Sequence, residues 1–532
     1  MPNRTARWDY LIVTAANAPQ AAAYEAQIRL RREAGELAQA EHALVIPDRD
    51  GRRVGSGGST LDCLAEVVRR ESQPGEDAGV AARAEAVLSR LRILIVHAGG
   101  DSRRLPAYSP CGKIFIPLPG GRNPRVGWTL FDRLVPPFLE LPAGAPGTGQ
   151  VVVASGDALI RFDASAVGFQ APGITALGAP ASPEEAARHG VLCPNADGTV
   201  RLYLQKPHPR VQKETGAIRS DGRALLDAGV MSFDGRAAAT LLGAFETPAA
   251  REAILSHGID LYREICCALG TDATPAHYVR SARSSGSTLD DALLARLFAA
   301  LHPIPLHLGV LEGFSFLHFG STSQLISSGL ELLAQDLGAL PSTTILAIDN
   351  DIQAGGRIDG REAWVEGCRI GAPLHLARRN VVVGLDVLEP LELAEGACLD
   401  VSAGLDRNGR NVWFIRCCGV DDTFKRSAGD GATFCGIPLA EWLRAVGVRF
   451  SDVWDSGTPE AGRTLWNARL FPAEPEHGAF RRWLWMFDLA RATAAEKLAF
   501  QAADRYSSAE IAVRADHAAF HARRAALRAA AG

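Results

Sequence analysis

The chain has 532 residues, of which 47% are hydrophobic, and 56 Lys and Arg residues against 60 Asp and Glu residues give a formal net charge of −4. This length exceeds one ordinary core, so we expect two to four domains in a soluble globular protein, and the charge balance argues against nucleic acid or an anionic membrane surface as a partner. Ten cysteines with no CxxC pair and no spacing to histidine typical of metal ligands favour a reduced, cytoplasmic protein.

The N-terminal two thirds of the chain show alternating strand and helix patterns. Residues 10–13 and 43–47 are predicted strands, residues 22–40 a helix between them, and residues 54–60 a glycine loop before a helix at 61–70. Further apolar runs beside turn residues predict strands at 92–96, 151–155, 200–207 and 229–233. The aliphatic run at 11–13 is too short for a signal peptide, and no stretch reaches the ~20 apolar residues of a membrane span. This alternation predicts an α/β fold with a mostly parallel sheet and helices on both faces.

The pattern changes near residue 340. Apolar residues then recur every six positions, at Leu346, Ile352, Ile358, Trp364, Ile370, Leu376, Val382 and Leu388. A period of six is typical of a β-helix in which each side of a coil turns one apolar residue inward, and an irregular β-sandwich is the alternative. Residues 404–431 are predicted as irregular loops with strands such as 411–416, and residues beyond 437 as mainly helical, with capping-box spacing at 507–510.

The first candidate for chemistry is the signature segment, residues 97–113, which follows the strand at 92–96. It contains Gly99 and Gly100, then Arg103 and Arg104, and ends at Lys113. Glycines at a strand end let backbone N–H groups approach an anion, and arginine and lysine add positive charge, so phosphate is the predicted ligand. An ordinary strand-to-helix turn with a solvated arginine would use the same residue types.

Acidic residues supply a candidate cation site. Asp157 follows the strand at 151–155, where a carboxylate could hold a hard divalent cation against substrate phosphates, and Asp260 carries a weaker signal of the same kind. A Gly-Asp turn without a metal is the alternative. Lys206 lies at another strand end, and His318 and Thr322 at a third. These could bind a sugar phosphate, whereas His318 could equally be a hydrogen-bonded strand-end histidine.

Together these motifs resemble the sugar nucleotidyltransferases, whose signature reads LxGGxGTRLxPxTxxxPK. The chain has VHAGGDSRRLP at 96–106 and PCGK at 110–113. Ser102-Arg103 in place of Gly-Thr, and Gly-Lys in place of Pro-Lys, are similar to the fucose-1-phosphate guanylyltransferase branch, which includes the N-terminal part of bifunctional fucokinase/GDP-fucose pyrophosphorylases. Further similar stretches are VGSGGST, DAGVMSF, GIDLY, FLHFGST, GVDDTFK and TLWNARLFP. No loop similar to the GLSSS-like phosphate loop of the bifunctional proteins' kinase is found, so we do not expect the chain to phosphorylate fucose.

The resemblance implies a fold, a reaction and a set of residues. It implies a Rossmann-like nucleotidyltransferase domain at 1–335, a β-helix-like domain at 336–436 and a helical region at 437–532. A sugar-1-phosphate would attack GTP and release pyrophosphate, with Mg²⁺ as cofactor. The expected catalytic residues are Arg104 and Lys113, and the expected metal ligands Asp157 and Asp260. Nucleotide contacts are expected at Gly57, Gly58, Gly99, Gly100, Asp101, Ser102 and Arg103. Substrate contacts are expected at Lys206, Asp227, Gly229, His318 and Thr322.

Three other hypotheses stay open at this point. The same chemistry could use UTP or another sugar-1-phosphate, the chain could bind a nucleotide sugar without turnover, or the six-residue repeat could carry an acyltransferase that uses His375. We expect small-molecule substrates and neither nucleic acid nor membrane as partners. For the β-helix the sequence leaves two roles, contact between copies of the chain in a homo-oligomer or bracing of the catalytic domain.

Overall fold

The computed structural model describes residues 7–72, 80–120, 126–339 and 343–531, and the chain divides into two compact units. Unit 1 comprises Met1–Gly100 and Leu134–Phe316, and unit 2 comprises Asp101–Arg133 and Leu317–Gly532. This division differs from the expected boundaries at 335 and 436, because residues 101–133 and helix α11 (Thr322–Leu337) pack with the C-terminal part of the chain. The signature segment therefore begins in unit 1 and continues in unit 2.

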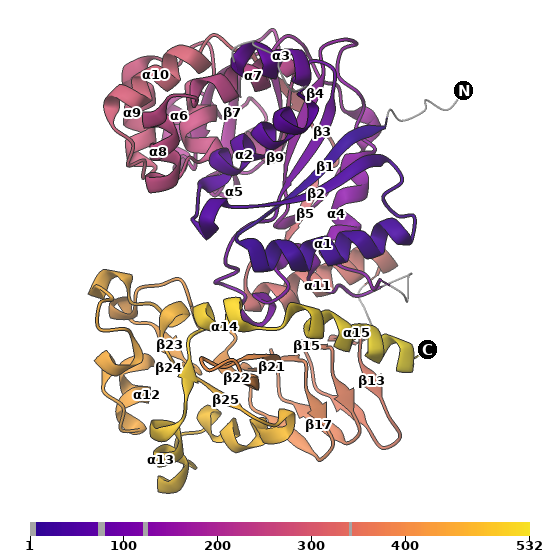
Figure 1. Ribbon diagram of the computed structural model, residues 1–532, viewed down its shortest axis with the longest axis vertical. Helices are drawn as coiled ribbons and strands as arrows, with labels where there is room; N and C mark the ends of the chain where they lie inside the picture. Colours follow the sequence, from indigo (N-terminus) through magenta and orange to yellow (C-terminus); the bar gives the residue numbers. More distant parts are fainter. Residues whose placement is uncertain (1–6, 73–79, 121–125, 340–342, 532) are drawn as a thin grey trace. The chain divides into compact units, whose positions relative to one another are not determined.

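Unit 1 is built on a sheet that has nine strands within the described residues, with a main path of β10-β6-β9-β4-β3-β1-β2 (Figure 1). Its strands are β1 (Trp8–Ala15), β2 (Ala40–Pro47), β3 (Arg92–His97), β4 (Gln150–Ser155), β6 (Ile174–Ala181), β7 (Gly190–Pro194), β8 (Val200–Gln205), β9 (Ala224–Phe233) and β10 (Leu306–Val310). Parallel pairing joins β2, β1, β3 and β4, whereas β9 runs antiparallel to both β4 and β6. Four of the six pairings along this path are parallel, and the two that involve β9 are antiparallel, so the sheet is mixed rather than uniformly parallel. The antiparallel β7–β8 hairpin precedes β9 in the chain, and β9 also pairs antiparallel with β7.

Helices lie between the strands of unit 1 in the sequence. They are α1 (Ala18–Glu33), α2 (Gly55–Glu71), α3 (Val80–Leu88), α5 (Pro183–Ala186), α6 (Pro209–Glu214), α7 (Gly235–Ala244), α8 (Pro248–His257), α9 (Pro275–Ser284) and α10 (Asp291–Leu301), and α4 (Leu130–Leu139) spans the boundary with unit 2. The predicted helix at 22–40 ends early, because Gly35 takes a left-handed conformation with φ of 79°. Strand β1, which lies next to the edge strand β2, is buried along nearly all of its length, and Tyr10 and Ile12 join Leu61 and Leu64 of α2 in one core.

Unit 2 contains three sheets of short parallel strands that alternate along the chain. β12 (Ile345–Ile348), β15 (Ala363–Glu366), β18 (Val381–Val383) and β21 (Ala397–Leu405) form the first. β13 (Asp351–Ile352), β16 (Arg369–Ile370) and β19 (Asp386–Val387) form the second, and β14 (Arg357–Asp359), β17 (Pro373–Leu376) and β20 (Leu391–Leu393) the third. Each turn of chain thus adds one strand to every sheet, as when Leu346 pairs with Trp364 and Trp364 with Val381.

The six-residue pattern predicts most inward positions in these sheets but not all. Leu346, Trp364, Ile370, Leu376 and Val382 are buried, and Ile358 is half-buried. The prediction is wrong for Ile352 and Leu388, which are 51% and 63% exposed. β13 is the outer strand of its sheet, so Ile352 has a strand on one side only. In β19, Val387 pairs with Ile370 and takes the buried position. Leu388 then follows the end of β19 and is exposed.

The rest of unit 2 is antiparallel and helical. β22 (Asn411–Gly419) pairs with β21 over nine residues, so residues 404–419 are more regular than predicted, and β23 (Thr433–Phe434), β24 (Ile437–Pro438), β25 (Phe471–Glu474) and β26 (Arg505–Tyr506) follow. The helices are α12 (Leu439–Ala445), α13 (Ala494–Ala502), α14 (Ser508–Arg514) and α15 (His517–Ala531). The predicted capping box is confirmed at the start of α14 by Ser507 and Glu510. α15 lies along β13 and β21 (Figure 1).

Candidate functional site

The carboxyl ends of β3 and β4 in unit 1 meet at one edge of the sheet. His97 at the end of β3 pairs with Ser155 at the end of β4, and the Gly156 N–H donates to the His97 carbonyl oxygen at 2.9 Å. A Cβ on Gly156 would lie 2.7 Å from that oxygen, so the close approach of the two strand ends requires glycine. The signature segment and Asp157 therefore leave the sheet side by side, where α/β proteins bind ligands.

Asp157 is oriented by a neighbour on its own strand end. The Ser155 hydroxyl donates to the Asp157 carboxylate at 2.9 Å. Gly229, a predicted substrate residue in β9, has a φ of 72°, and a Cβ there would lie 3.2 Å from the Ser155 Cβ and 3.8 Å from the Tyr262 hydroxyl. Glycine at this position thus keeps the space between the Ser155 and Tyr262 side chains open.

The Tyr262 hydroxyl is the common neighbour of the predicted acidic residues. Burial raises the pKa of Tyr262 well above its usual value, and the charges of Asp227, Asp260 and Asp157 raise it further. Three carboxylates proposed from separate stretches of sequence therefore act on one hydroxyl in unit 1. Sequence reasoning missed Tyr262, although the GIDLY stretch that contains it was among the matching motifs.

Asp227 is held by two donors in the buried part of this group. The Tyr203 hydroxyl donates to one carboxylate oxygen at 2.7 Å, and the Gly229 N–H donates to the other at 2.8 Å. Burial raises the pKa of Asp227 to about 6, and the two hydrogen bonds oppose this rise. Burial likewise raises the pKa of Tyr203 well above its usual value, so Tyr203 stays a hydroxyl donor at neutral pH.

Asp260 lies at the start of a π-helical turn, Leu261–Ile265, and caps it. One carboxylate oxygen of Asp260 accepts the Tyr262 and Arg263 N–H groups at 3.0 and 2.9 Å. Asp157 and Asp260 supply the carboxylate oxygens that Mg²⁺ prefers, so the donor set fits this ion. In the part of the chain that the structure describes, no group of three or more His, Cys, Asp or Glu side chains is arranged to hold a metal. Mg²⁺ held by one or two carboxylates and by substrate phosphates needs no such group.

Gly57 and Gly58 do not lie in a loop. The stretch predicted as a glycine loop at 54–60 is the beginning of helix α2, and the N–H groups of Gly57 and Gly58 donate to the Ile259 carbonyl at 2.8 and 3.1 Å. A Cβ on Gly57 would lie 2.8 Å from the Ile259 side chain, and one on Gly58 would lie 2.9 Å from the Val54 Cβ. These glycines serve close packing of α2 against the chain before Asp260, because their amides already have an acceptor. Nucleotide contact at Gly57 and Gly58 stays a prediction.

A half-buried histidine lies at the start of the signature segment. The Nε2 atom of His97 is 3.0 Å from the Thr60 hydroxyl of α2. Burial lowers the pKa of His97 to about 4, so the ring is neutral at physiological pH. Both residues lie in segments that the sequence analysis singled out, but a histidine at a strand end carries no signal for its partner on a distant helix.

The predicted phosphate loop begins with two different glycines. The Ala98 and Gly99 N–H groups both donate to the Thr14 hydroxyl at 3.1 Å, so the Gly99 amide already has an acceptor. Gly100 has a φ of 127°, and a Cβ there would meet nothing within 4 Å. Gly100 is thus required by its backbone conformation rather than by crowding.

The next residues of the segment belong to unit 2. The Arg103 guanidinium forms an ion pair with the Asp101 carboxylate at 2.7 Å, and Ser102 is buried with a φ of 52°. Arg104 is exposed, and its carbonyl oxygen accepts the N–H of Thr322 at 3.0 Å. Thr322, a predicted substrate residue, is thereby buried at the start of α11 and holds the backbone of a predicted catalytic residue.

Of the remaining predicted residues, Lys206 and His318 lie at strand ends as expected, and Lys113 lies in a short helix. Lys113 begins a short 3-10 helix, Lys113–Phe115, directly after Gly112, whose φ is 68°. His318 ends strand β11 (Ser315–His318), and its carbonyl oxygen accepts the Ser328 hydroxyl at 2.6 Å. Lys206 follows β8, is exposed, and donates its N–H to the His189 carbonyl at 3.0 Å. The ligand contacts of these three residues stay predictions.

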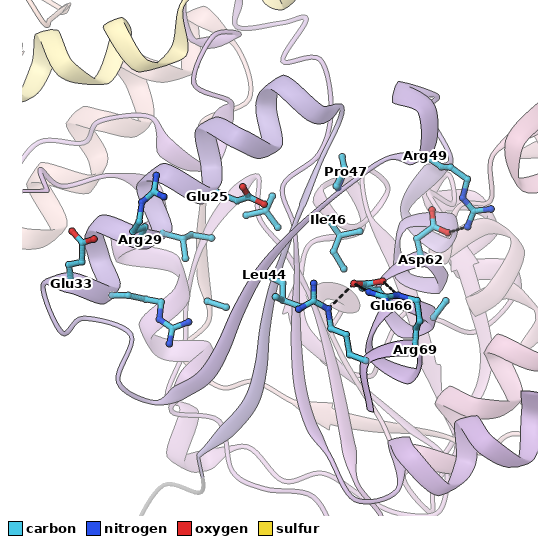
Figure 2. A pocket seen from close by; sticks show the side chains of 16 residues that line it. Glu25, Arg29, Glu33, Leu44, Ile46, Pro47, Arg49, Asp62, Glu66 and Arg69 are labelled. Atoms are coloured by element: carbon cyan, nitrogen blue, oxygen red, sulfur yellow. Dashed lines mark hydrogen bonds and ion pairs between the residues drawn. The ribbon is translucent and has the colours of Figure 1, made fainter. Parts of the chain in front are cut away.

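A cavity of about 770 Å³ in unit 1 lies away from these residues. Figure 2 shows it between α1, the edge strand β2 and α2, with the side chains of Leu44 and Ile46 turned into it. Charged side chains on its walls neutralise one another, since Glu66 accepts from Arg69 at 2.8 Å. None of the predicted site residues lines this cavity.

Comparison with known proteins places the chain in a family. A family model described as the fucose pyrophosphorylase domain matches residues 85–476, so the chain belongs to that family. It is 28% identical to a bifunctional fucokinase/GDP-fucose pyrophosphorylase of Arabidopsis thaliana, over 93% of this chain and 50% of that protein. It is 26% identical to an L-fucokinase/L-fucose-1-P guanylyltransferase of Bacteroides fragilis, over 82% of this chain and 43% of that protein. It is 25% identical to a fucose-1-phosphate guanylyltransferase of Mus musculus, over 87% of this chain and 83% of that protein. The chain thus spans about half the length of the bifunctional relatives, and these matches confirm the resemblance seen in the motifs.

Proposed function

We propose that this chain transfers a guanylyl group from GTP to L-fucose-1-phosphate and releases pyrophosphate. The observation that carries the proposal is the family match over residues 85–476, because this range includes the signature segment and the acidic residues around Tyr262. The names of these relatives supply the base and the sugar. Use of UTP or of another sugar-1-phosphate, binding without turnover and acyl transfer are not favoured by these names.

The proposed step is an in-line displacement at phosphorus. A phosphate oxygen of the sugar-1-phosphate forms a bond to the α-phosphorus of GTP, the bond from that phosphorus to the oxygen bridging to the β-phosphorus breaks, and the electron pair leaves with pyrophosphate. Arg104 would stabilise the charge that gathers on pyrophosphate, and Lys113 would contact the α-phosphate. Gly99, Gly100, Asp101, Ser102 and Arg103 would contact the nucleotide.

The acidic residues of unit 1 are the proposed metal ligands. Asp157 and Asp260 would hold Mg²⁺, which supplies charge neutralisation for the phosphates when it is bound. The Ser155 hydroxyl restrains the Asp157 carboxylate through their hydrogen bond, and the two backbone N–H groups on Asp260 restrain that carboxylate. These restraints reduce the freedom that the carboxylates lose on binding an ion.

Five residues are proposed as contacts for the sugar phosphate. Lys206, Asp227, Gly229, His318 and Thr322 are the candidates. Asp227 is the strongest of these on structural grounds, because a buried carboxylate with a raised pKa is an unfavourable feature that folding alone would not require.

Two finer descriptions of the fold and a location belong to this proposal. The parallel β2-β1-β3-β4 order supports a Rossmann-like description of unit 1, and the three interleaved parallel sheets support a β-helix in unit 2. None of the helices in the described residues is long and apolar enough to cross a lipid bilayer. A cytoplasmic location is supported instead by the ten cysteines, all of which are free thiols.

The test is pyrophosphate release by the purified protein with Mg²⁺. We expect release with GTP and L-fucose-1-phosphate, and slower release when ATP, CTP or UTP, or another sugar-1-phosphate, replaces one of them. Failure to release pyrophosphate from GTP and L-fucose-1-phosphate would overturn the proposal.

Matched variants then assign the residues. Asp157→Asn and Lys113→Ala should each remove most of the transfer and leave the thermal unfolding curve unchanged. Asp163→Asn and Lys213→Ala are the controls, because Asp163 is exposed six residues further along the chain than Asp157 and Lys213 is exposed on α6. Wild-type rates in the first two variants would show that the assignment is wrong.

A further inference from the structure

The C-terminal helix α15 contacts the chain between Arg104 and Lys113. This part of the signature segment forms a 3-10 helix, Pro106–Tyr108, and Tyr108 is fully buried. The Phe520 ring of α15 lies edge-on to the Tyr108 ring with centroids 6.4 Å apart, and a ring nitrogen of His517 hydrogen-bonds to the Pro110 carbonyl. Residues more than 400 positions apart in sequence therefore pack together within unit 2.

A buried chain of hydrogen bonds continues this contact. The Trp364 indole N–H donates to the Tyr108 oxygen at 2.6 Å, and the Tyr108 hydroxyl donates to Glu366 Oε2 at 3.1 Å. Arg524 of α15 donates to the same carboxylate oxygen at 2.6 Å. The side chains of Glu366 and Arg524 are 0% and 3% exposed. The Tyr108 hydroxyl is thus fixed from two sides, by β15 and, through Glu366, by α15.

Separate contacts hold α15 in place on unit 2. Arg523 donates to the Asp386 carboxylate at 2.6 Å and to the Gly367 carbonyl at 2.9 Å. Arg528 donates to Asp349 at 2.5 Å. Asp386, Gly367 and Asp349 lie in or beside the short parallel strands of unit 2 and not in the signature segment. Arg524 differs from its neighbours on the helix, because its guanidinium points inward to the carboxylate that accepts the Tyr108 hydroxyl.

A buried ion pair is a poor way to gain stability, because desolvation of both charges offsets their attraction. Apolar side chains of similar volume would fill the same space at no such cost. In the Glu366–Arg524 pair, Arg524 holds the Glu366 carboxylate at a fixed position, where it accepts the Tyr108 hydroxyl. Tyr108 in turn lies in the signature segment between Arg104 and Lys113. We propose that Tyr108, Glu366 and Arg524 are positioning residues that fix the signature segment for transfer, an inference that rests on the proposed function.

The first experiment removes the hydroxyl alone. Tyr108→Phe keeps the ring contacts with Trp364 and Phe520, so the protein should fold. We expect kcat to fall about tenfold while KM for GTP changes less than twofold, because small displacements of positioned groups cost rate more than binding. Amide hydrogen exchange at residues 104–113 should become faster, with exchange in β21 unchanged. A folded Tyr108→Phe protein with wild-type kcat and wild-type exchange would overturn the proposal.

A second experiment separates positioning from stability. Glu366→Met with Arg524→Met replaces the ion pair by apolar side chains, so the melting temperature should stay near that of the wild type. Because Tyr108 then lacks its acceptor, kcat should still fall about tenfold. Arg523→Met is the control, since it weakens the docking of α15 without touching Glu366, and it should lower the melting temperature with kcat unchanged. Full activity in the double variant would refute positioning by this pair.

Failure of the proposed function gives a different result. A wild-type protein that releases no pyrophosphate contradicts the function, while faster exchange at 104–113 in Tyr108→Phe still supports the positioning of the segment. If the wild-type protein releases pyrophosphate and Tyr108→Phe has the same kcat and the same amide exchange as the wild type, the positioning proposal is wrong and the proposed function still holds.

Discussion

Asp227→Asn should make the protein more stable at neutral pH and less active. Asp227 is 6% exposed, and burial raises the pKa of its carboxyl from 3.8 to about 6. This rise corresponds to about 3 kcal/mol of unfolding free energy, since one pH unit is worth about 1.36 kcal/mol. The folded state binds the proton more tightly than the unfolded state. The stabilising contribution of the protonated carboxyl is therefore fully present below about pH 4 and is lost as the pH rises through about 6.

Asparagine resembles the protonated carboxyl and does not titrate. The variant and the wild type should be about equally stable near pH 4, and at neutral pH the variant should be more stable by up to about 3 kcal/mol. Urea unfolding followed by tryptophan fluorescence at several pH values measures this difference. An asparagine can still accept the Gly229 N–H and pair with the Tyr203 hydroxyl, so the fold should be kept. Parallel stability curves for the two proteins, or a less stable variant at neutral pH, would refute the reasoning.

Three further predictions follow from the packing and the pKa values. Gly57→Ala should cost about 1–3 kcal/mol in urea unfolding, because its Cβ would lie 2.8 Å from the Ile259 side chain. Leu388→Ser should change stability by less than about 0.5 kcal/mol, whereas Val387→Ala should cost more than about 1 kcal/mol, since Val387 takes the buried position. The ring of His97 should give constant NMR chemical shifts from about pH 6 to 8, because burial lowers its pKa to about 4. A titration of this ring near its ordinary pKa would contradict the lowered value.

Strand positions in this protein were predicted well because their signal is local. The runs at 92–96 and 151–155 lie within β3 and β4, and both are buried on two faces, which gives continuous apolar sequence. Strand direction is not local in this way. β9 was predicted as a strand, but its antiparallel course depends on its pairing with β7, which no single run of residues encodes.

The glycines of the chain show a second limit. Gly57 and Gly58 fitted a phosphate loop by composition, and in the structure they pack α2 against Ile259, about 200 residues away in sequence. Gly100, by contrast, has the positive φ and the open surroundings that a phosphate loop requires, although it is a glycine like Gly57 and Gly58. Composition alone cannot separate these two uses of glycine, because one depends on backbone conformation and the other on a distant neighbour.

Residues 97–113 form one sequence motif, but the residues that hold them by hydrogen bonds come from different parts of the chain. In unit 1 the Gly99 amide donates to Thr14, and in unit 2 the carbonyl of Arg104 accepts from Thr322 while the Tyr108 hydroxyl donates to Glu366. A loop that binds phosphates by backbone and charge must be rigid before the ligand arrives, or it loses binding energy to its own ordering. In this chain the rigidity comes from partners distant in sequence. Substitutions at Thr14 or Glu366 should therefore reduce the rate without removing any group that contacts the substrate.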